Sequence, residues 1–262
     1  MAKVFALESG EDVSRAVGEF LAQASAEAIA RAGRFTVAFS GGSLPAVACR
    51  ALRTMDGVDF SRWHVFWADE RCVPLDDAES NFRLVREELL APLAAAGRAI
   101  PDAQVVRIAA ALVADPAAAA ADYQRRMQQA LGGGGGDSGE GGSAPALDCV
   151  LLGIGPDGHT CSLFPGHPLL DERALWVAPI EDSPKPPPRR ITLTMPVVNA
   201  ARRVAFVATG AGKRDTLRRI IDLRDPALPA ARVAPADGCL YWFVDRPAAQ
   251  DLATPTASSF SL

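Results

Sequence analysis

The turn at residues 153–160 holds the side chain best suited to proton transfer. The segment reads GIGPDGHT and follows an apolar run that predicts a strand. The ordinary pKa of histidine lies near neutrality, so His159 is a candidate general base. Asp157 can turn back to bond the imidazole and fix its tautomer, or can contact a substrate hydroxyl. The plainer interpretation is a histidine whose ring is satisfied by its own loop.

The same turn matches GxGxxG, the pattern of dinucleotide-binding turns. Pro165 would interrupt the long helix that follows such a turn, and the segment does not open a βαβ unit. Asp157 and His159 would also crowd a pyrophosphate. A zinc site is a further alternative, because Cys161 and His167 lie near His159 in sequence. Their spacing matches no common zinc pattern and a fourth ligand is not evident, so we expect neither a dinucleotide nor a metal.

A charged cluster follows another predicted strand, at residues 63–67. It consists of Asp69, Glu70 and Arg71. Arg71 could hold an anion or polarise a carbonyl, and the two carboxylates could bind sugar hydroxyls. Mixed charges more often form a surface ion-pair cluster. The position at the carboxyl end of a strand favours a functional role.

A glycine turn lies between the predicted strand 35–39 and a helix that starts near Leu44. It contains Gly41, Gly42 and Ser43. Glycines let a backbone approach a ligand closely, and the free N–H groups of a helix start favour an anion such as phosphate. The alternative is a tight turn in which Ser43 only caps the helix.

A second glycine turn, residues 209–213, reads TGAGK. It is not a Walker A loop, because Val207 stands where the first glycine should be and Arg214 replaces Ser or Thr. Lys213 can still supply a point charge to a phosphate, and the planar guanidinium of Arg190 could donate two parallel hydrogen bonds to it. For each of these cations the alternative is a solvated basic residue.

The elements around these turns alternate between strands and helices, which predicts a mainly parallel sheet covered on both faces. A proline run at 184–188 forbids a helix in the stretch 171–196, so we expect an open doubly wound sheet rather than a TIM barrel. We expect one α/β domain over residues 1–262.

The segment 132–142, GGGGGDSGEGG, is expected to be a flexible surface loop, with a domain linker as the alternative. The predicted strands are 35–39, 63–67, 104–108, 147–152, 176–179, 191–195, 204–208 and 240–244, and the predicted helices are 11–31, 44 onward, 80–90, 116–131 and 213–223.

Composition bounds the class of protein. The 262 residues are 49% hydrophobic with a net charge of −4, which excludes a wholly disordered chain and argues against a dedicated nucleic-acid binder. We expect neither a transmembrane helix nor a secretory signal. Five scattered cysteines without a CxxC pair suit reduced thiols in a cytoplasmic protein. No strongly apolar surface helix stands out, so we expect a monomer.

Taken in order, these segments resemble the 6-phosphogluconolactonase family, within the glucosamine-6-phosphate isomerase/6-phosphogluconolactonase group. The resemblance covers about residues 35–245 and is closest to animal-type enzymes, which share the SPKPPP run. The segment PDGHTCSLFP is its most specific part. The resembling stretches are 39–43, 69–71, Ser80 with Asn81, 153–165, 184–194 and 210–213.

The resemblance implies hydrolysis of 6-phosphoglucono-1,5-lactone to 6-phosphogluconate, the second step of the oxidative pentose phosphate pathway. It implies a fold shared with glucosamine-6-phosphate deaminases and no cofactor. By position, His159 resembles the general base, Arg71 the group that stabilises charge on the lactone carbonyl, and Asp157 and Asp69 the site carboxylates. The residues that resemble the phosphate-holding set are Gly41, Gly42, Ser43, Arg190 and Lys213.

Two other functions stay open on the sequence. An isomerase or deaminase of amino sugar phosphates tends to carry an acidic residue shortly after the histidine, whereas here none follows until Asp171. A non-catalytic sugar-phosphate-binding protein would keep the glycine turn and Lys213 but would not need His159.

Overall fold

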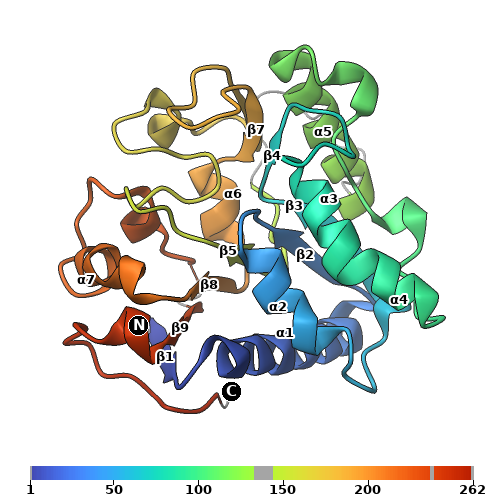
Figure 1. Ribbon diagram of the computed structural model, residues 1–262. Helices are drawn as coiled ribbons and strands as arrows, with labels where there is room; N and C mark the ends of the chain where they lie inside the picture. Colours follow the sequence, from blue (N-terminus) through green and yellow to red (C-terminus); the bar gives the residue numbers. More distant parts are fainter. Residues whose placement is uncertain (1, 133–143, 237–238, 261–262) are drawn as a thin grey trace.

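A six-stranded parallel sheet forms the centre of the computed structural model, which describes residues 2–132, 144–236 and 239–260 (Figure 1). The strand order is β1-β9-β8-β5-β2-β3, and every neighbouring pair is parallel. Buried aliphatic and aromatic side chains fill these strands, as expected for a sheet covered on both faces. The predicted α/β fold class is confirmed. The strands are β1 (Lys3–Leu7), β2 (Phe35–Phe39), β3 (Trp63–Trp67), β5 (Cys149–Leu152), β8 (Val204–Ala208) and β9 (Leu240–Asp245).

A second, smaller sheet corrects the expectation that all strands belong to one sheet. It has the order β4-β7-β6 and is antiparallel. Its strands are β4 (Asp69–Arg71), β7 (Arg190–Leu193) and β6 (Val177–Ile180). The sequence pattern missed β4 because its three residues are all charged, and apolar alternation is the usual signal of a strand. It also missed β1.

Helices flank the sheets. Helix α1 (Gly10–Ala32) packs against α2 (Leu44–Leu52), while α5 (Pro116–Leu131) packs against β6 and β7. Asp115 caps α5 by accepting a hydrogen bond from the N–H of Ala118. The remaining helices are α3 (Asn81–Val85), which continues through a π-helical turn (Arg86–Leu90) into α4 (Ala91–Ala95), then α6 (Met195–Ala200), α7 (Arg214–Ile221) and α8 (Arg246–Ala249).

The predicted strand at 104–108 is wrong. Residues Asp102–Gln104 form a 3-10 turn, and the chain pairs with β3 only through a single bridge from Val105 to Val65. The apolar side chains that suggested a strand are buried without a ladder. The predicted glycine-rich loop at 132–142 lies outside the described residues apart from Gly132, which ends α5 in the left-handed conformation.

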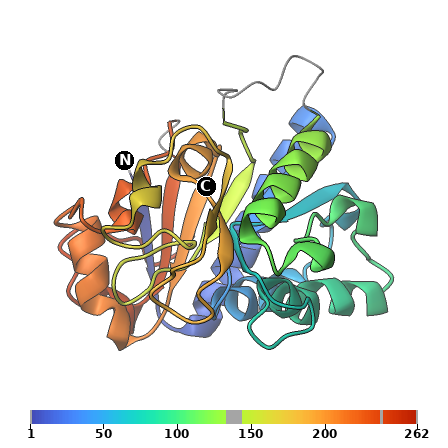
Figure 2. The same ribbon diagram turned by 90° about the horizontal axis from the view of Figure 1, so that it is seen from above.

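The strand order creates a switch point between β2 and β5. From β2 the chain continues to β3 on one side of it, whereas β5 and the strands after it lie on the other side. Ligands of open α/β sheets bind beyond the carboxyl ends of the strands at such a point. The long connection from β5 to β7 lies on the side of α7, away from α3 and α4 (Figure 1 and Figure 2). Among the described residues, no helix is long and apolar enough to cross a membrane.

Candidate active site

A pocket of about 230 Å³ lies at this switch point. Its wall comes from the chain just after β2, β5 and β8, together with residues of β4 and β7. All the residues predicted for the site line it except Asp157, which instead contacts the lining residue His159. The predicted residues in the wall are Gly41, Gly42, Ser43, Asp69, Arg71, His159, Arg190 and Lys213.

His159 and Asp157 form a close pair. Nδ1 of His159 lies 2.5 Å from Oδ1 of Asp157. Burial lowers the pKa of His159 below its ordinary value, and the charge and hydrogen bond of Asp157 offset this only in part. Burial raises the pKa of Asp157, but the bond to His159 and the charge of Lys185 outweigh it and keep that pKa low. Asp157 is therefore an ionised acceptor, so Nδ1 must carry the proton.

The loop around this pair is closed by its own backbone. The N–H of Gly155 donates to the carbonyl of His159 at 2.9 Å, and the N–H of Gly158 donates to the carbonyl of Gly155 at 3.0 Å. A Cβ at position 155 would lie 2.0 Å from Nδ1 of His159, so only glycine fits beneath the ring. With these N–H groups engaged and no long helix following the turn, the geometry disfavours the dinucleotide alternative.

Asp69 joins two loops of the pocket. Its Oδ1 accepts from the hydroxyl of Ser40 at 2.8 Å, and its Oδ2 accepts from the hydroxyl of Ser162 at 2.9 Å. The carboxylate is buried. It thus ties the glycine turn after β2 to the histidine loop after β5. Sequence reasoning included Ser162 in a motif but gave it no role, because its partner lies 93 positions away.

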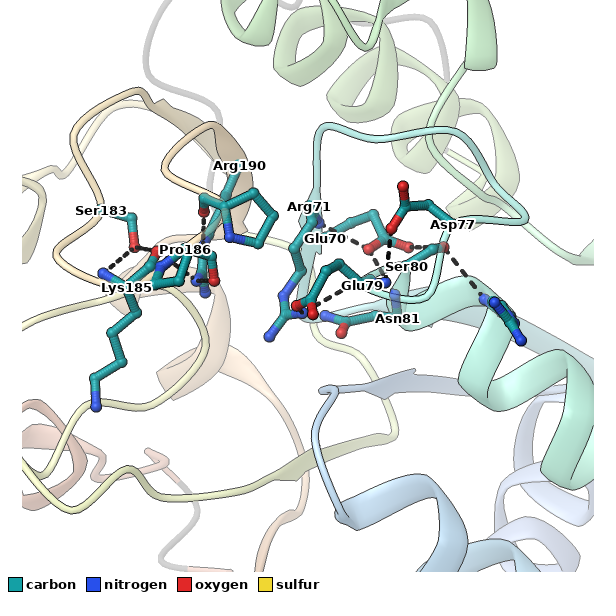
Figure 3. Close-up of polar contacts among 12 residues, drawn as sticks. Glu70, Arg71, Asp77, Glu79, Ser80, Asn81, Ser183, Lys185, Pro186 and Arg190 are labelled. Atoms are coloured by element: carbon teal, nitrogen blue, oxygen red, sulfur yellow. Dashed lines mark hydrogen bonds and ion pairs between the residues drawn. The ribbon is translucent and has the colours of Figure 1, made fainter.

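Arg71 faces the pocket, whereas Glu70 does not. Nη1 of Arg71 donates to the carbonyl of Glu79 at 2.8 Å, while its buried Nε has no hydrogen-bond partner among the described residues. Both hydrogen bonds of the guanidinium to Glu79 come from Nη1, so the donors of Nη2 are available to an anion in the pocket. The expectation that Glu70 binds sugar hydroxyls is wrong. Its carboxylate is buried and accepts from the N–H groups of Arg71 and Asn81 at 2.7 and 2.8 Å (Figure 3). It also accepts from the N–H of Phe82 at 2.7 Å.

Asn81 is a residue of this region that sequence reasoning left without a role. Its Nδ2 donates to the carbonyl of Asp69 at 2.8 Å. Its Oδ1 is buried, has no hydrogen-bond partner among the described residues and lies against Gly41. A Cβ at position 41 would lie 1.8 Å from that oxygen. The first glycine of the turn is therefore required by close approach, whereas Gly42 is in the left-handed conformation (φ 69°) with open space beside it.

Ser43 occupies the predicted position before α2, but its hydroxyl makes no capping hydrogen bond. Its backbone is already in the helical region (φ −76°, ψ −11°), a geometry that differs from the extended backbone of a capping residue. Ser43 therefore holds the N-cap position, but the alternative in which its side chain only caps the helix is wrong. The residue lines the pocket instead, at the start of a nine-residue helix.

The two predicted phosphate cations differ in their surroundings. Nζ of Lys213 donates a single bond of 2.7 Å, to the carbonyl of Ile154. Burial is the main cause that lowers the pKa of Lys213, followed by the charge of Lys185. Arg190 directs four N–H contacts to protein acceptors, one to the hydroxyl of Ser162 and three to loop carbonyls. A guanidinium has five N–H donors, so Arg190 has one left for a ligand.

Among the described residues, no group of three His, Cys, Asp or Glu side chains is placed to hold a metal ion. His167, weighed as a ligand beside His159 and Cys161, pairs instead with Asp182, with 3.1 Å between Nε2 and Oδ1. The Cys161 thiol is buried, and burial raises its pKa well above the usual range.

Comparison with known proteins places the chain in a family. The model of a family described as glucosamine-6-phosphate isomerases/6-phosphogluconolactonase matches residues 8–242. A 6-phosphogluconolactonase of Rattus norvegicus is 45% identical over 94% of this chain and 92% of its own length, and one of Homo sapiens is also 45% identical over the same shares.

Solved structures agree. A 6-phosphogluconolactonase from Thermotoga maritima is 29% identical, with a TM-score of 0.75 over 94% of this chain and all of its own. One from Leishmania guyanensis reaches a TM-score of 0.82 at 25% identity, over 97% of this chain and all of its own. A monomeric glucosamine-6-phosphate deaminase, at 17% identity and a TM-score of 0.70, shares the fold. The chain therefore belongs to the glucosamine-6-phosphate isomerase/6-phosphogluconolactonase family.

Proposed function

We propose that this chain hydrolyses 6-phosphoglucono-1,5-lactone to 6-phosphogluconate, with water activated by His159. The chain is a hydrolase of the 6-phosphogluconolactonase type, as its 44–45% identical relatives are named. The observation that carries the catalytic proposal is the pair of His159 and Asp157 at a pocket that also contains the cations Arg71 and Lys213.

His159 takes a proton from water in the first step. Because Nδ1 donates to Asp157, the lone pair of the imidazole lies on Nε2, which has no hydrogen-bond partner among the described residues. Water loses a proton to Nε2 as its oxygen forms a bond to C1 of the lactone. The bond between C1 and the ring oxygen then breaks, and the proton on Nε2 passes to that oxygen. No serine nucleophile is required.

Arg71 stabilises the negative charge that develops on the carbonyl oxygen. A single donor aimed at such an oxyanion accelerates the reaction by about 10²–10³-fold in comparable sites. The contact with the carbonyl of Glu79 holds one end of the guanidinium, and Arg71 lines the pocket beside His159. Asp69 acts through Ser40 and Ser162, because both of its oxygens are already engaged with these hydroxyls.

The phosphate is bound by the glycine turn after β2 and by Lys213, which line the same pocket as His159. Gly41, Gly42 and Ser43 bring backbone N–H groups and the start of α2 to the anion, and Lys213 adds a full positive charge. The remaining donor of Arg190 adds a weaker contact. Holding the phosphate in this way positions C1 over His159, which turns a bimolecular encounter into an oriented one.

The purified protein tests the proposal directly. It should release acid from freshly generated 6-phosphogluconolactone far faster than the uncatalysed reaction, and release no ammonia from glucosamine 6-phosphate. Deaminase activity without lactonase activity would refute the proposal. The residues after His159 favour the first outcome, because the next acidic residue, Asp171, does not line the pocket.

A further inference from the structure

Lysine is rare in this chain, and its distribution is uneven. The sequence contains 24 arginines but only three lysines, Lys3, Lys185 and Lys213. Lys3 lies on β1, where its ammonium is 5.7 Å from the centre of the Tyr241 ring. Lys213 lines the pocket, whereas Lys185 lies outside the lining, against Asp157, the partner of the lining residue His159. An ammonium is a compact charge on a flexible stem, unlike the planar guanidinium used elsewhere in the chain.

The loop that carries Lys185 is held in place by its neighbours. The hydroxyl of Ser183 accepts from the N–H of Lys185 at 3.2 Å and donates to its carbonyl at 2.9 Å. Arg190 donates to three carbonyls, those of Lys185, Pro186 and Pro187, at 2.9–3.0 Å. The backbone at Lys185 is therefore fixed, while its side chain extends away from the loop (Figure 3). Arg190 acts here as a positioning residue.

The ammonium of Lys185 lies beside the proposed catalytic pair. Its Nζ is 3.8 Å from Oδ2 of Asp157, the oxygen opposite the one that bonds His159. Its charge also lowers the pKa of Lys213, after the larger effect of burial, and Asp157 opposes both. The ammonium groups of Lys185 and Lys213 thus repel each other, with only the carboxylate of Asp157 between them in charge. A phosphate dianion that bound near both would reduce this repulsion.

The cations that line the pocket are largely engaged. A phosphate monoester carries a charge of about −1.5 to −2 at neutral pH. Four of the five N–H donors of Arg190 are hydrogen-bonded to the protein. Arg71 pairs with Glu79 and contacts the lactone carbonyl in the proposed mechanism. Lys213 alone would leave much of the phosphate charge uncompensated. The side chain of Lys185 is 37% exposed and carries its ammonium on a flexible four-carbon stem.

We propose that Lys185 is the second cation of the phosphate site: on substrate binding its ammonium leaves Asp157 and, with Lys213, holds the phosphate from the other side. This inference rests on the proposed function. The competing role is a permanent partner of Asp157 that only keeps the carboxylate ionised. The two roles predict different effects of removing the charge of Lys185. In the first role phosphate binding is weakened, and in the second role the chemical step is slowed.

The test replaces Lys185 with Gln and measures binding separately from turnover. We expect the Kd of 6-phosphogluconate, the inhibition constant of inorganic phosphate and KM to rise about 10- to 100-fold, with kcat within about threefold. Lys185→Arg keeps the charge and should recover most of the lost affinity. Lys3→Gln, the remaining lysine, is the matched control and should change none of these values.

A fall in kcat with an unchanged Kd for 6-phosphogluconate would overturn the inference and assign Lys185 to Asp157 alone. Unchanged values throughout would also overturn it. Because the Kd is measured without turnover, this result is independent of the proposed reaction. Absence of lactonase activity in the wild-type protein would refute the proposed function, whatever Lys185→Gln does to phosphate binding.

Discussion

Gly41 and Asn81 are in such close contact that a single added carbon at position 41 would lie 1.8 Å from Oδ1 of Asn81. The same side chain donates to the carbonyl of Asp69. Asn81 begins α3, so this contact connects the glycine turn after β2, the short strand β4 and a helix far along the chain. The proposed phosphate site and the proposed oxyanion site are thereby held by one buried amide.

Gly41→Ala should lower kcat/KM by at least about 100-fold, because the turn must shift by roughly an ångström to make room. Gly42→Ala is the matched control. It meets no neighbour within 4 Å and suffers only the strain of its positive φ, so it should be milder. Steady-state kinetics checks both. Adding Asn81→Ala to Gly41→Ala should recover part of the loss, and equal impairment of the two glycine variants would contradict this account.

Asp157→Asn should lower kcat by about 10²–10⁴-fold, because the amide no longer fixes the proton on Nδ1 of His159 or stabilises the imidazolium. The pKa of His159 should fall further, since Asp157 raises it. The acid limb of kcat/KM should therefore move to lower pH. The matched variant Asp182→Asn, which removes the charge of the surface partner of His167, should leave kcat and the acid limb unchanged. The measurement is the pH profile of kcat/KM for the two variants, and an unshifted acid limb in Asp157→Asn would contradict the role of Asp157.

The acid limb of the wild-type kcat/KM should lie below pH 6.5. A general base works only when neutral, so activity is lost as the pH falls through the pKa of His159. Burial holds that pKa below the ordinary value of 6.5, because removing the ring from water disfavours its charged form. The measurement is kcat/KM against pH, corrected for spontaneous hydrolysis. An acid limb centred at or above pH 6.5 would be inconsistent with His159 as the base.

Glu70 should make stability depend on pH. Burial raises its pKa from 4.5 to about 7, so the folded protein binds this proton more tightly than the unfolded chain. The contribution of Glu70 to the unfolding free energy is therefore present at low pH and is lost as the pH rises towards 7 and above. Glu70→Gln does not titrate. Urea unfolding should show the wild type exceeding the variant by more at pH 5 than at pH 7.5, by on the order of 1–3 kcal/mol. A constant difference would contradict the raised pKa.

Much of this architecture is predictable from local pattern. Apolar runs such as residues 35–39 and 204–208 are long enough to be identified as buried strands, and the glycine turns that follow them mark the carboxyl edge of the sheet. The histidine turn after β5 is identified for the same reason. Because parallel strands end at one edge, these turns had to meet, and they do.

The features that escaped prediction depend on contacts between distant segments. Strand β4 forms from three charged residues only because β7 pairs with it. The role of Asn81 depends on Gly41, 40 positions earlier, and Lys185 reaches Asp157 only because Arg190 holds its loop. Glu70 is as polar as its neighbours Asp69 and Arg71, and nothing in the sequence indicates that its side chain points towards α3 rather than into the pocket.

His159→Gln in the purified protein tests the central claim most directly, with kcat and the Kd of 6-phosphogluconate measured side by side. We predict that kcat falls by about 10²–10⁴-fold while the Kd stays within about threefold, because the base is lost and the phosphate site is intact. A variant that retains kcat within tenfold of the wild type would contradict the assignment of His159 as the residue that activates water.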